Sequence, residues 1–209
     1  MPEVHPPLGR RERAKADKLR RIITAARELF DQADMATVTT QQVADRADVA
    51  VGTLFRYAAT KAELLILVQN QKFATAIDDG IAAATAATGS GAIAGVMALI
   101  EPVVTCVRER RENGRTYLHE LVFGDPDEPH RHQGLVLSAQ LEQAVAHVLR
   151  REDHLEAEPA STLARVVSAI LHLTVTATVH LYRSDTEVLA EIREQLRVTV
   201  THHNPRSTP

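Results

Sequence analysis

Apolar residues recur at helical spacing along most of the 209-residue chain. The first such segment begins near Arg13, and its apolar positions follow the i, i+3, i+4, i+7 pattern of an amphipathic helix, at Leu19, Ile22, Ile23, Ala26, Leu29, Phe30 and Ala33. We expect this helix to end near Gln32, before the sequence ADMATV. Residues 1–9, which are rich in proline, are expected to be disordered.

Two short helices are predicted to follow. Thr39 and Gln42, three residues apart, form a capping box that opens a helix of only two turns. Asp48 ends that helix, because an acidic side chain tolerates the left-handed turn conformation better than a branched one. A second short helix is expected over residues 50–57.

A longer helix comes next, opened by a second capping box at Thr60 and Glu63. Two short helices joined by a tight turn, after a longer helix, match a helix-turn-helix, whose second short helix lies in the DNA major groove. A plain three-helix bundle without a DNA role is the alternative.

The remaining sequence is also predicted to be helical. Helical segments are expected over residues 90–113, 114–124, 135–153, 159–184 and 185–203, with Pro102 inside the first and a turn-rich stretch at residues 125–134. Residues 172–181 alternate polar and apolar side chains as a strand does, and RVTVTH alternates as well. We predict helix there, because two isolated strands could not build a sheet with a hydrophobic face. The expected fold is all-α.

Composition limits the class of protein. Apolar residues make up 44% of the chain and aromatic residues 3%, without Trp, so Ala, Val, Leu and Ile must build the core. No uncharged apolar run is long enough to cross a membrane, and the N-terminus lacks the apolar region of a signal peptide. We therefore expect a cytoplasmic protein. Cys106 is the only cysteine, which excludes an intrachain disulfide; a buried apolar role is expected, with a redox-sensing thiol as the alternative.

Charge is distributed unevenly. Residues 1–61 hold 11 Lys and Arg against 8 Asp and Glu, a balance of +3, whereas the rest of the chain holds 13 against 19, a balance of −6. Within residues 10–27 there are eight basic and two acidic side chains. A solvated helix face explains such a run as well as a surface that faces phosphates.

Neither an enzyme nor a metal site is predicted. The chain lacks a Gly-rich phosphate loop and a GxSxG sequence, and no cofactor is expected. Potential metal ligands gather at His119, Glu120, Asp125, Asp127, Glu128, His130 and His132. Zinc requires three or four converging ligands, and neither HExxH nor CxxC occurs, so surface histidines are the expected explanation.

Residues Val43 to Leu65 resemble the TetR family of bacterial transcriptional regulators. The match extends over about residues 19–67 through the segments IITAARELF, TVTTQQVADRADVA, VGTLFRY and TKAELL, in the family's order and spacing. The resemblance implies a three-helix DNA-binding domain over residues 10–60 and a larger helical ligand-binding and dimerisation domain over residues 61–203. The tail at residues 204–209 is expected to be disordered from its own sequence. It also implies a homodimer through the last two long helices that binds a palindromic operator in double-stranded DNA and acts most often as a repressor.

The same resemblance implies which residues meet DNA. Thr40 and Gln41 would contact phosphates or base edges at the start of the first short helix. Lys61 would hold a phosphate at the N-terminus of the long helix, where the helix dipole also favours an anion. The recognition helix would present Val51, Gly52, Thr53, Phe55, Arg56 and Tyr57.

Several positions depart from the family pattern. Asp48 stands where the family usually has Gly, and Ala50 stands where a polar capping residue is usual. Val51 replaces a common Lys and Phe55 a common Tyr, so fewer groups can donate to phosphate. We expect Val51 and Phe55 to contact thymine methyl groups and the basic segment at residues 10–18 to compensate in nonspecific affinity.

A mostly apolar ligand pocket is expected among the C-terminal helices. The candidate lining residues are Leu99, Val103, Cys106, Tyr117, Leu121, Phe123, Ser168, His172 and Thr176. Tyr117 and His172 are the strongest candidates, because buried polar tips need partners, and ordinary core packing is the alternative for each residue. These residues suit a small, mostly apolar effector. A helical small-molecule-binding protein without a DNA function remains the second hypothesis.

Overall fold

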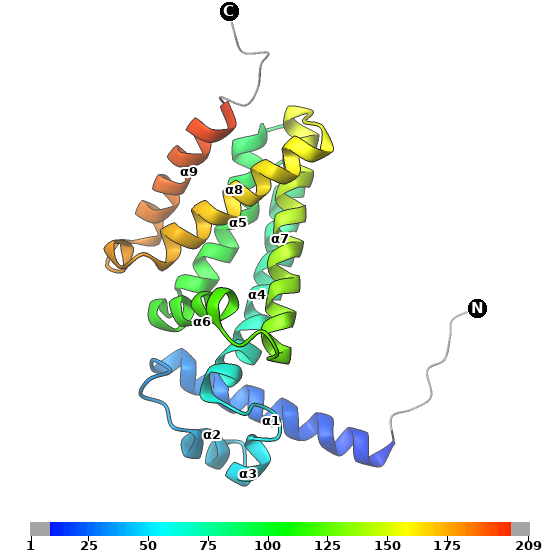
Figure 1. Cartoon of the computed structure of the whole chain (residues 1–209), viewed down its shortest axis with the longest axis vertical. Coiled ribbons are helices and arrows are strands. Elements are labelled where there is room, and N and C mark those ends of the chain that lie inside the picture. The colour runs from blue at the N-terminus through cyan, green and yellow to red at the C-terminus, as the bar shows by residue number, and fades with distance from the viewer. Residues whose placement is uncertain (1–8, 202–209) are drawn as a thin grey trace, which may run out of the picture. The chain divides into compact units, whose positions relative to one another are not determined.

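The computed structural model describes residues 9–201, which form a predominantly helical protein (Figure 1). The elements are α1 (Arg10–Gln32), α2 (Thr40–Arg46), α3 (Val51–Leu54), α4 (Lys61–Ala86), α5 (Ala92–Arg108), α6 (Arg111–Phe123), α7 (Pro129–Asp153), α8 (Ala157–Thr176), the 3₁₀ helix η1 (Thr178–His180) and α9 (Asp185–Thr201). No strand occurs among the described residues, which confirms the all-α prediction. Of the residues predicted to be disordered, 1–9 and 204–209, all but Gly9 lie outside the described residues.

The chain divides into two compact units between Val68 and Gln69, a point that lies inside α4. In the first unit, α1 packs on α2 and α2 packs on α3. One face of α1 is buried, and it consists of Ile22, Ala25, Ala26 and Phe30. These positions keep the spacing that predicted the helix, so its amphipathic face forms the core of this unit. None of the described helices is both long and apolar enough to cross a membrane.

The turn between α2 and α3 depends on Asp48. This residue has a φ of 53°, in the left-handed region that the sequence predicted for it. From α1, Nη1 of Arg21 donates to the Asp48 carbonyl oxygen at 3.2 Å and to its Oδ2 at 3.0 Å. Because α1 holds both the backbone and the side chain of this residue, it also constrains the direction in which α3 leaves the turn.

The capping box that opens α2 is confirmed. The Thr39 N–H donates to Oε1 of Gln42 at 2.8 Å, and the Gln42 N–H donates to Oγ1 of Thr39 at 3.2 Å. The second predicted box forms in part. The Glu63 N–H donates to Oγ1 of Thr60 at 3.1 Å, but the Glu63 carboxylate accepts from the N–H of Ala59.

The second short helix is shorter than predicted, since α3 covers four residues and not residues 50–57. Ala50 precedes it without a side-chain cap. Beyond Leu54 the chain tightens: the Arg56 N–H donates to the Thr53 carbonyl at 3.1 Å, and the Tyr57 N–H donates to the Leu54 carbonyl at 2.9 Å. Bonds to the residue three positions back define a 3₁₀-like turn, so the helical path continues in a narrower form.

In the second unit, Pro102 lies within α5, which remains helical around it. The prediction of a turn-rich stretch over residues 125–134 is wrong from Pro129 onward, because α7 begins there. The Glu128 side chain accepts the N–H groups of His130, at 2.8 Å, and Arg131. A carboxylate cap followed by proline in the first helical position is a strong start signal, and the histidines therefore lie in the first turn of a helix.

The predicted helix over residues 159–184 also requires a correction, since α8 ends at Thr176 and η1 follows. Three arginines hold this connection through its backbone carbonyls. Arg115 Nε donates to Thr176 O at 2.8 Å, and Arg111 Nη1 donates to Leu181 O at 2.8 Å.

Arg108, which is almost fully buried, completes this arginine cluster. Its Nη2 donates to Arg183 O at 2.7 Å, and its Nε binds Oδ1 of Asp185 at 2.8 Å. These donors replace the intrahelical partners that the carbonyls lose, so the chain can leave the helix between α8 and α9.

Candidate DNA-binding surface and ligand cavity

The α2–turn–α3 segment places one side of α3 in the interior and the other on the surface. Leu54 is 1% exposed and anchors α3, whereas Phe55 is 45% exposed. Val51 and Thr53 are half-buried, and Gly52 is exposed. A large aromatic ring that is left on the surface beside small side chains forms an apolar contact patch, which we call the α3 patch: Val51, Gly52, Thr53 and Phe55.

Gly52 has no role in packing. A Cβ built at this position would meet no atom within 4 Å, and its φ lies outside the left-handed region. Glycine in a helix is less stable than alanine by about 0.5–1 kcal/mol. The fold therefore gains nothing from this glycine, while an approaching molecule gains direct access to the backbone of α3.

Three of the predicted polar DNA contacts have accessible side chains that do not hold the fold together. Arg56 is exposed, and its guanidinium makes no hydrogen bond or ion pair with any described residue. Thr40 is half-buried at the start of α2, and Gln41 is exposed, with its amide donating to Oδ1 of Asp45 at 2.7 Å. All three remain predicted DNA contacts on accessible positions.

Tyr57 and Lys61 are tied to the protein itself. The Tyr57 hydroxyl donates to the Lys15 carbonyl of α1 at 3.3 Å. Nζ of Lys61 donates to the carbonyls of Ala36 and Val38 at 3.1 and 3.0 Å, so an ammonium with three donors retains one. Each can meet a phosphate only alongside its structural role.

The basic segment of α1 lies next to this surface. The Tyr57–Lys15 hydrogen bond brings the first half of α1 against the chain that follows α3. Arg10, Arg11, Lys15 and Lys18 are all exposed there. Exposed cations beside an apolar patch are suited to a polyanion whose grooves carry apolar groups.

The second unit contains a partly open, mostly apolar cavity of about 240 Å³, whose lining includes the exposed Val122 and Leu135. Its lining comes from α4, α5, α6, α7 and α8 and comprises Phe73, Val103, Val104, Val107, Leu118, Leu121, Val122, Leu135, Ser138, Leu141, Ser168, Leu171, His172 and Val175. Of the residues proposed from the sequence, four meet here: Val103, Leu121, Ser168 and His172.

The other five candidates lie outside this lining. Tyr117 is buried, and its hydroxyl donates to Oδ1 of Asn70 at 2.9 Å. Phe123 is largely exposed beside His119. Oγ1 of Thr176 donates to the His172 carbonyl at 2.6 Å, Cys106 is half-buried in α5, and Leu99 lines a different cavity. The lining residues that sequence reasoning missed come from all five helices and, apart from Ser138, are apolar. The apolar periodicity of these helices was recognisable in the sequence, although the void between them was not.

Burial and charge define the polar part of the cavity. Burial lowers the pKa of the His172 imidazole below its usual value, and the nearby His119 lowers it further. The imidazole is therefore neutral at pH 7. Ser138 donates to the Gly134 carbonyl at 3.0 Å, whereas the side chains of Ser168 and His172 form no hydrogen bond within residues 9–201.

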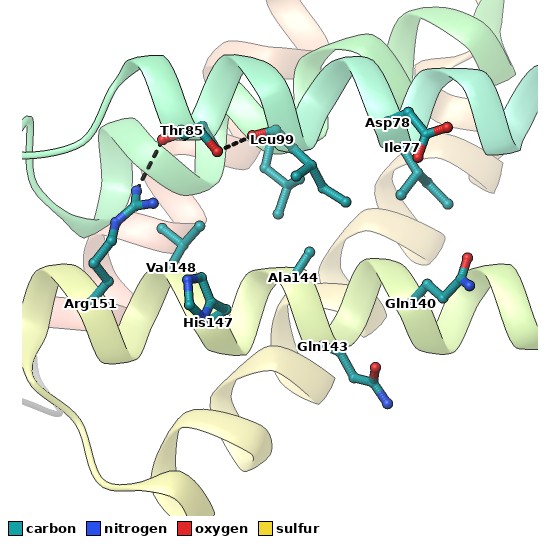
Figure 2. A pocket seen from close by; sticks show the side chains of 12 residues that line it. Ile77, Asp78, Thr85, Leu99, Gln140, Gln143, Ala144, His147, Val148 and Arg151 are labelled. Atoms are coloured by element: carbon teal, nitrogen blue, oxygen red, sulfur yellow. Dashed lines mark hydrogen bonds between the residues drawn. The ribbon is translucent and has the colours of Figure 1, made fainter. Parts of the chain in front are cut away.

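A second cavity of about 440 Å³ lies between α4 and α7 (Figure 2). Its lining comprises Ile77, Asp78, Ile81, Ala84, Thr85, Leu99, Gln140, Gln143, Ala144, His147, Val148 and Arg151. Figure 2 shows Asp78 and Gln140 toward one end and Arg151 toward the other. Nη2 of Arg151 donates to the Ala84 carbonyl at 3.0 Å, and its Nε donates to Glu152 at 2.8 Å, so this cation is already engaged.

An apolar strip runs along α8. Val166, Ile170 and Leu173 follow the i, i+4, i+7 spacing of one helix face. Leu173 is 69% exposed, and on α9 Val198 is also exposed. Exposed apolar side chains aligned on two neighbouring helices are typical of a surface that another chain covers.

Among the described residues, no group of three or more His, Cys, Asp or Glu side chains could hold a metal ion. Glu128, one of the ligands considered from the sequence, instead caps α7.

Comparison with the sequences of known proteins matches only part of the chain. Residues 22–68 match the family model described as bacterial regulatory proteins, tetR family. The HTH-type transcriptional repressor KstR of Mycobacterium tuberculosis (strain ATCC 25618 / H37Rv) is 38% identical over 60 residues, which are 29% of this chain and 27% of KstR. KstR of Rhodococcus jostii (strain RHA1) is also 38% identical over 60 residues, 29% of this chain and 28% of that protein. The chain thus matches under a third of the length of these curated relatives.

Solved structures extend the likeness to the whole fold. The FadR repressor of Thermus thermophilus, in complex with lauroyl-CoA, has a TM-score of 0.68 and 21% identity, covering 91% of this chain and 97% of FadR. A TetR transcriptional regulator from Rhodococcus sp. RHA1 has a TM-score of 0.66 and 18% identity, covering 89% and 97%. At these identities the likeness shows a shared fold.

Proposed function

We propose that this chain is a DNA-binding transcriptional regulator of the TetR family of bacterial regulatory proteins, whose family model matches residues 22–68 and whose solved members share its fold. In this proposal the protein acts as a homodimer that binds a palindromic operator, represses transcription there and dissociates from the operator when a small effector binds. The DNA would be read by the α3 patch together with Thr40, Gln41 and Arg56.

The observation that carries this proposal is the construction of α3. The helix is anchored by the buried Leu54, directed by the Asp48 turn, and open at Gly52, where no protein atom approaches. A helix presented in this way can enter the major groove until its backbone nears the DNA. The apolar Val51 and Phe55 suit thymine methyl groups, and the exposed guanidinium of Arg56 suits a guanine edge.

A dimer is the second part of the proposal. The strip Val166–Ile170–Leu173 on α8 and the exposed Val198 on α9 support an interface through these two helices. A two-fold dimer presents two α3 helices, which requires half-sites separated by about one helical turn of DNA or a multiple of it.

The effector part rests on the apolar cavity in the second unit. Phe73 contributes to its lining from α4, and Lys61 begins the same helix. Twelve residues of α-helix separate them, or about 18 Å along the axis. An effector that favours one tilt of α4 would change operator affinity only if it binds that conformer more tightly than the DNA-competent one.

The alternative is a helical small-molecule-binding protein without a DNA function. It explains the cavity but not the glycine that the fold does not need in α3, and it assigns no role to the exposed Arg56.

Mobility-shift binding to the DNA upstream of the protein's own coding region distinguishes the two hypotheses. The regulator binds this DNA more tightly than random sequence. Arg56→Ala weakens specific binding by roughly 1–3 kcal/mol if the residue reads a base. The matched control is Arg150→Ala, which removes an exposed arginine of α7 and leaves binding unchanged. A genome-wide map of bound sites that finds no enriched sequence would contradict the proposal.

A further inference from the structure

Two half-buried polar side chains line the partly open cavity without a protein partner. Ser168 and His172 lie one helical turn apart on α8, and in the described part of the chain neither side chain makes a hydrogen bond. Their remaining neighbours in the lining are apolar, apart from Ser138. Both side chains are half-buried in an otherwise mostly apolar lining, so a ligand's polar group placed between them can replace water as their hydrogen-bond partner.

We propose that the cavity binds a compact, electrically neutral molecule of about ten non-hydrogen atoms, with one hydroxyl or carbonyl group seated between Ser168 and His172. This ligand class deepens the effector part of the proposed function and rests on it for any effect on DNA.

Cavity volume sets the size of the part of the ligand that the partly open cavity can enclose. An apolar cavity of about 150 Å³ accommodates benzene, which has six non-hydrogen atoms. In proportion, the 240 Å³ of this cavity accommodates about ten. A lauroyl chain has twelve carbon atoms before its coenzyme A group is counted, so this cavity does not enclose the ligand held by the Thermus thermophilus FadR structure.

The lining sets the charge of the ligand. It contains no Lys, Arg, Asp or Glu. A carboxylate or ammonium placed there would lose its hydration without gaining a counter-ion, which is far more costly than burying a hydroxyl that finds a partner. His172 does not supply the missing cation, because burial and its neighbour His119 hold its pKa low.

Hydrogen-bond chemistry sets the functional group. A neutral imidazole offers one donor and one acceptor, and a serine hydroxyl offers both. A ligand hydroxyl can donate to one of the two side chains and accept from the other, whereas a carbonyl can accept from both. An alkane can form a hydrogen bond with neither side chain, so the ligand needs one polar group. A second polar group on the ligand would find no hydrogen-bond partner in the lining.

Titration calorimetry on the full-length protein without DNA tests this proposal with probes that differ from one another in charge or in length. 1-Octanol is the neutral probe, octanoate and octylammonium are its charged counterparts, and 1-dodecanol tests the size limit. We expect 1-octanol to bind at least about 10-fold more tightly than either ion and more tightly than 1-dodecanol. Octanoate binding as tightly as 1-octanol, or no binding of 1-octanol at all, overturns the proposal.

Variants locate the polar group. Ser168→Ala removes the hydroxyl with little change in volume and should weaken 1-octanol binding about 3- to 10-fold. Ser161→Ala makes the same change on an exposed position of α8 and should leave the affinity unchanged. His172→Phe fills the cavity and should abolish binding, with a circular dichroism melt to verify folding. Equal affinities for wild type and Ser168→Ala would contradict the seating of the polar group.

The same measurements separate this proposal from the proposed function. If the protein binds 1-octanol with these preferences but binds no operator, the ligand class is supported and the regulator is rejected. Operator binding by a protein that prefers octanoate supports the regulator and rejects the ligand class.

Discussion

At the scale of single residues, function is indicated where a residue does not serve the fold. Gly52 has open space around it, while Asp48 in the preceding turn is held by Arg21. Lys61 shows the opposite case, since two of its donors bind the carbonyls of Ala36 and Val38. Loss of Lys61 would therefore disturb the segment before α2 as well as any phosphate contact.

Gly52→Ala tests the α3 patch directly. The added methyl meets no protein atom, so we expect the variant to be more stable by about 0.5–1 kcal/mol in urea denaturation. The same methyl would keep DNA from the helix backbone and weaken operator binding at least about 10-fold in a mobility-shift assay.

Gly9→Ala is the matched control, because a Cβ at Gly9 also meets nothing within 4 Å and the residue precedes α1. Operator binding should be unaffected in this variant. Wild-type affinity in Gly52→Ala would mean that DNA does not approach α3 closely.

At the scale of elements, the connection between α8 and α9 depends on the arginine cluster. Arg108 is buried, and its one carboxylate partner is Asp185, which is 37% exposed by side chain. The cluster also binds backbone carbonyls at the end of α8 and in the segment after it, and Arg115 pairs with Glu112 on its own helix. The cluster thus holds the start of α9 against the end of α5 and sets how the two last helices present their outer faces.

Asp185→Ala should lower the free energy of unfolding by about 2 kcal/mol, because it leaves a buried guanidinium without its counter-ion. Urea denaturation followed by circular dichroism measures this loss. Glu194→Ala breaks an exposed ion pair with Arg197 on the same helix and should leave the transition midpoint unchanged. Equal midpoints for the two variants would show that Arg108 finds other partners.

At the scale of the whole molecule, the proposed dimer depends on side chains that one subunit leaves uncovered. Val175 on α8 is 6% exposed and lines the cavity, so a substitution there would test packing within one subunit. Leu173 is the appropriate position, since it is exposed on the apolar strip.

Leu173→Asp should give folded monomers in sedimentation velocity, because a carboxylate buried between two apolar strips has no partner. Val136→Asp changes an exposed valine of α7 and should remain dimeric. A Leu173→Asp variant that is folded and fully dimeric would place the interface elsewhere.

The coupling between cavity and operator is a property of the whole molecule as well. A coupling of about 1–3 kcal/mol lowers operator affinity roughly 5- to 150-fold when the effector is bound. By linkage, operator DNA must weaken effector binding by the same factor. Calorimetric titration of a cavity ligand with and without operator measures this factor, and identical affinities would separate the cavity from DNA binding.

The amino-acid sequence by itself determined the all-helical fold, the capping box at Thr39 and Gln42, the left-handed turn at Asp48 and the family of residues 22–68. The helices and the capping box depend on neighbours within about four positions along the chain, so a local pattern is sufficient to specify them. The turn at Asp48 was also recognisable in the sequence, although in the fold it is held by Arg21, which is distant in the chain. The start of α7 at Pro129 had such a local signal in Glu128, although the turn-forming composition around it obscured that signal.

Only the tertiary structure decided which inward-facing side chains surround empty space. Tyr117 and His172 looked equivalent as polar tips on apolar helices, yet Tyr117 binds Asn70, whereas His172 faces a cavity completed by Phe73 and Leu141. The physical reason is that a void arises from the spacing of five helices. Each helix face encodes burial, but the distance to the opposite face depends on side chains far away in the sequence.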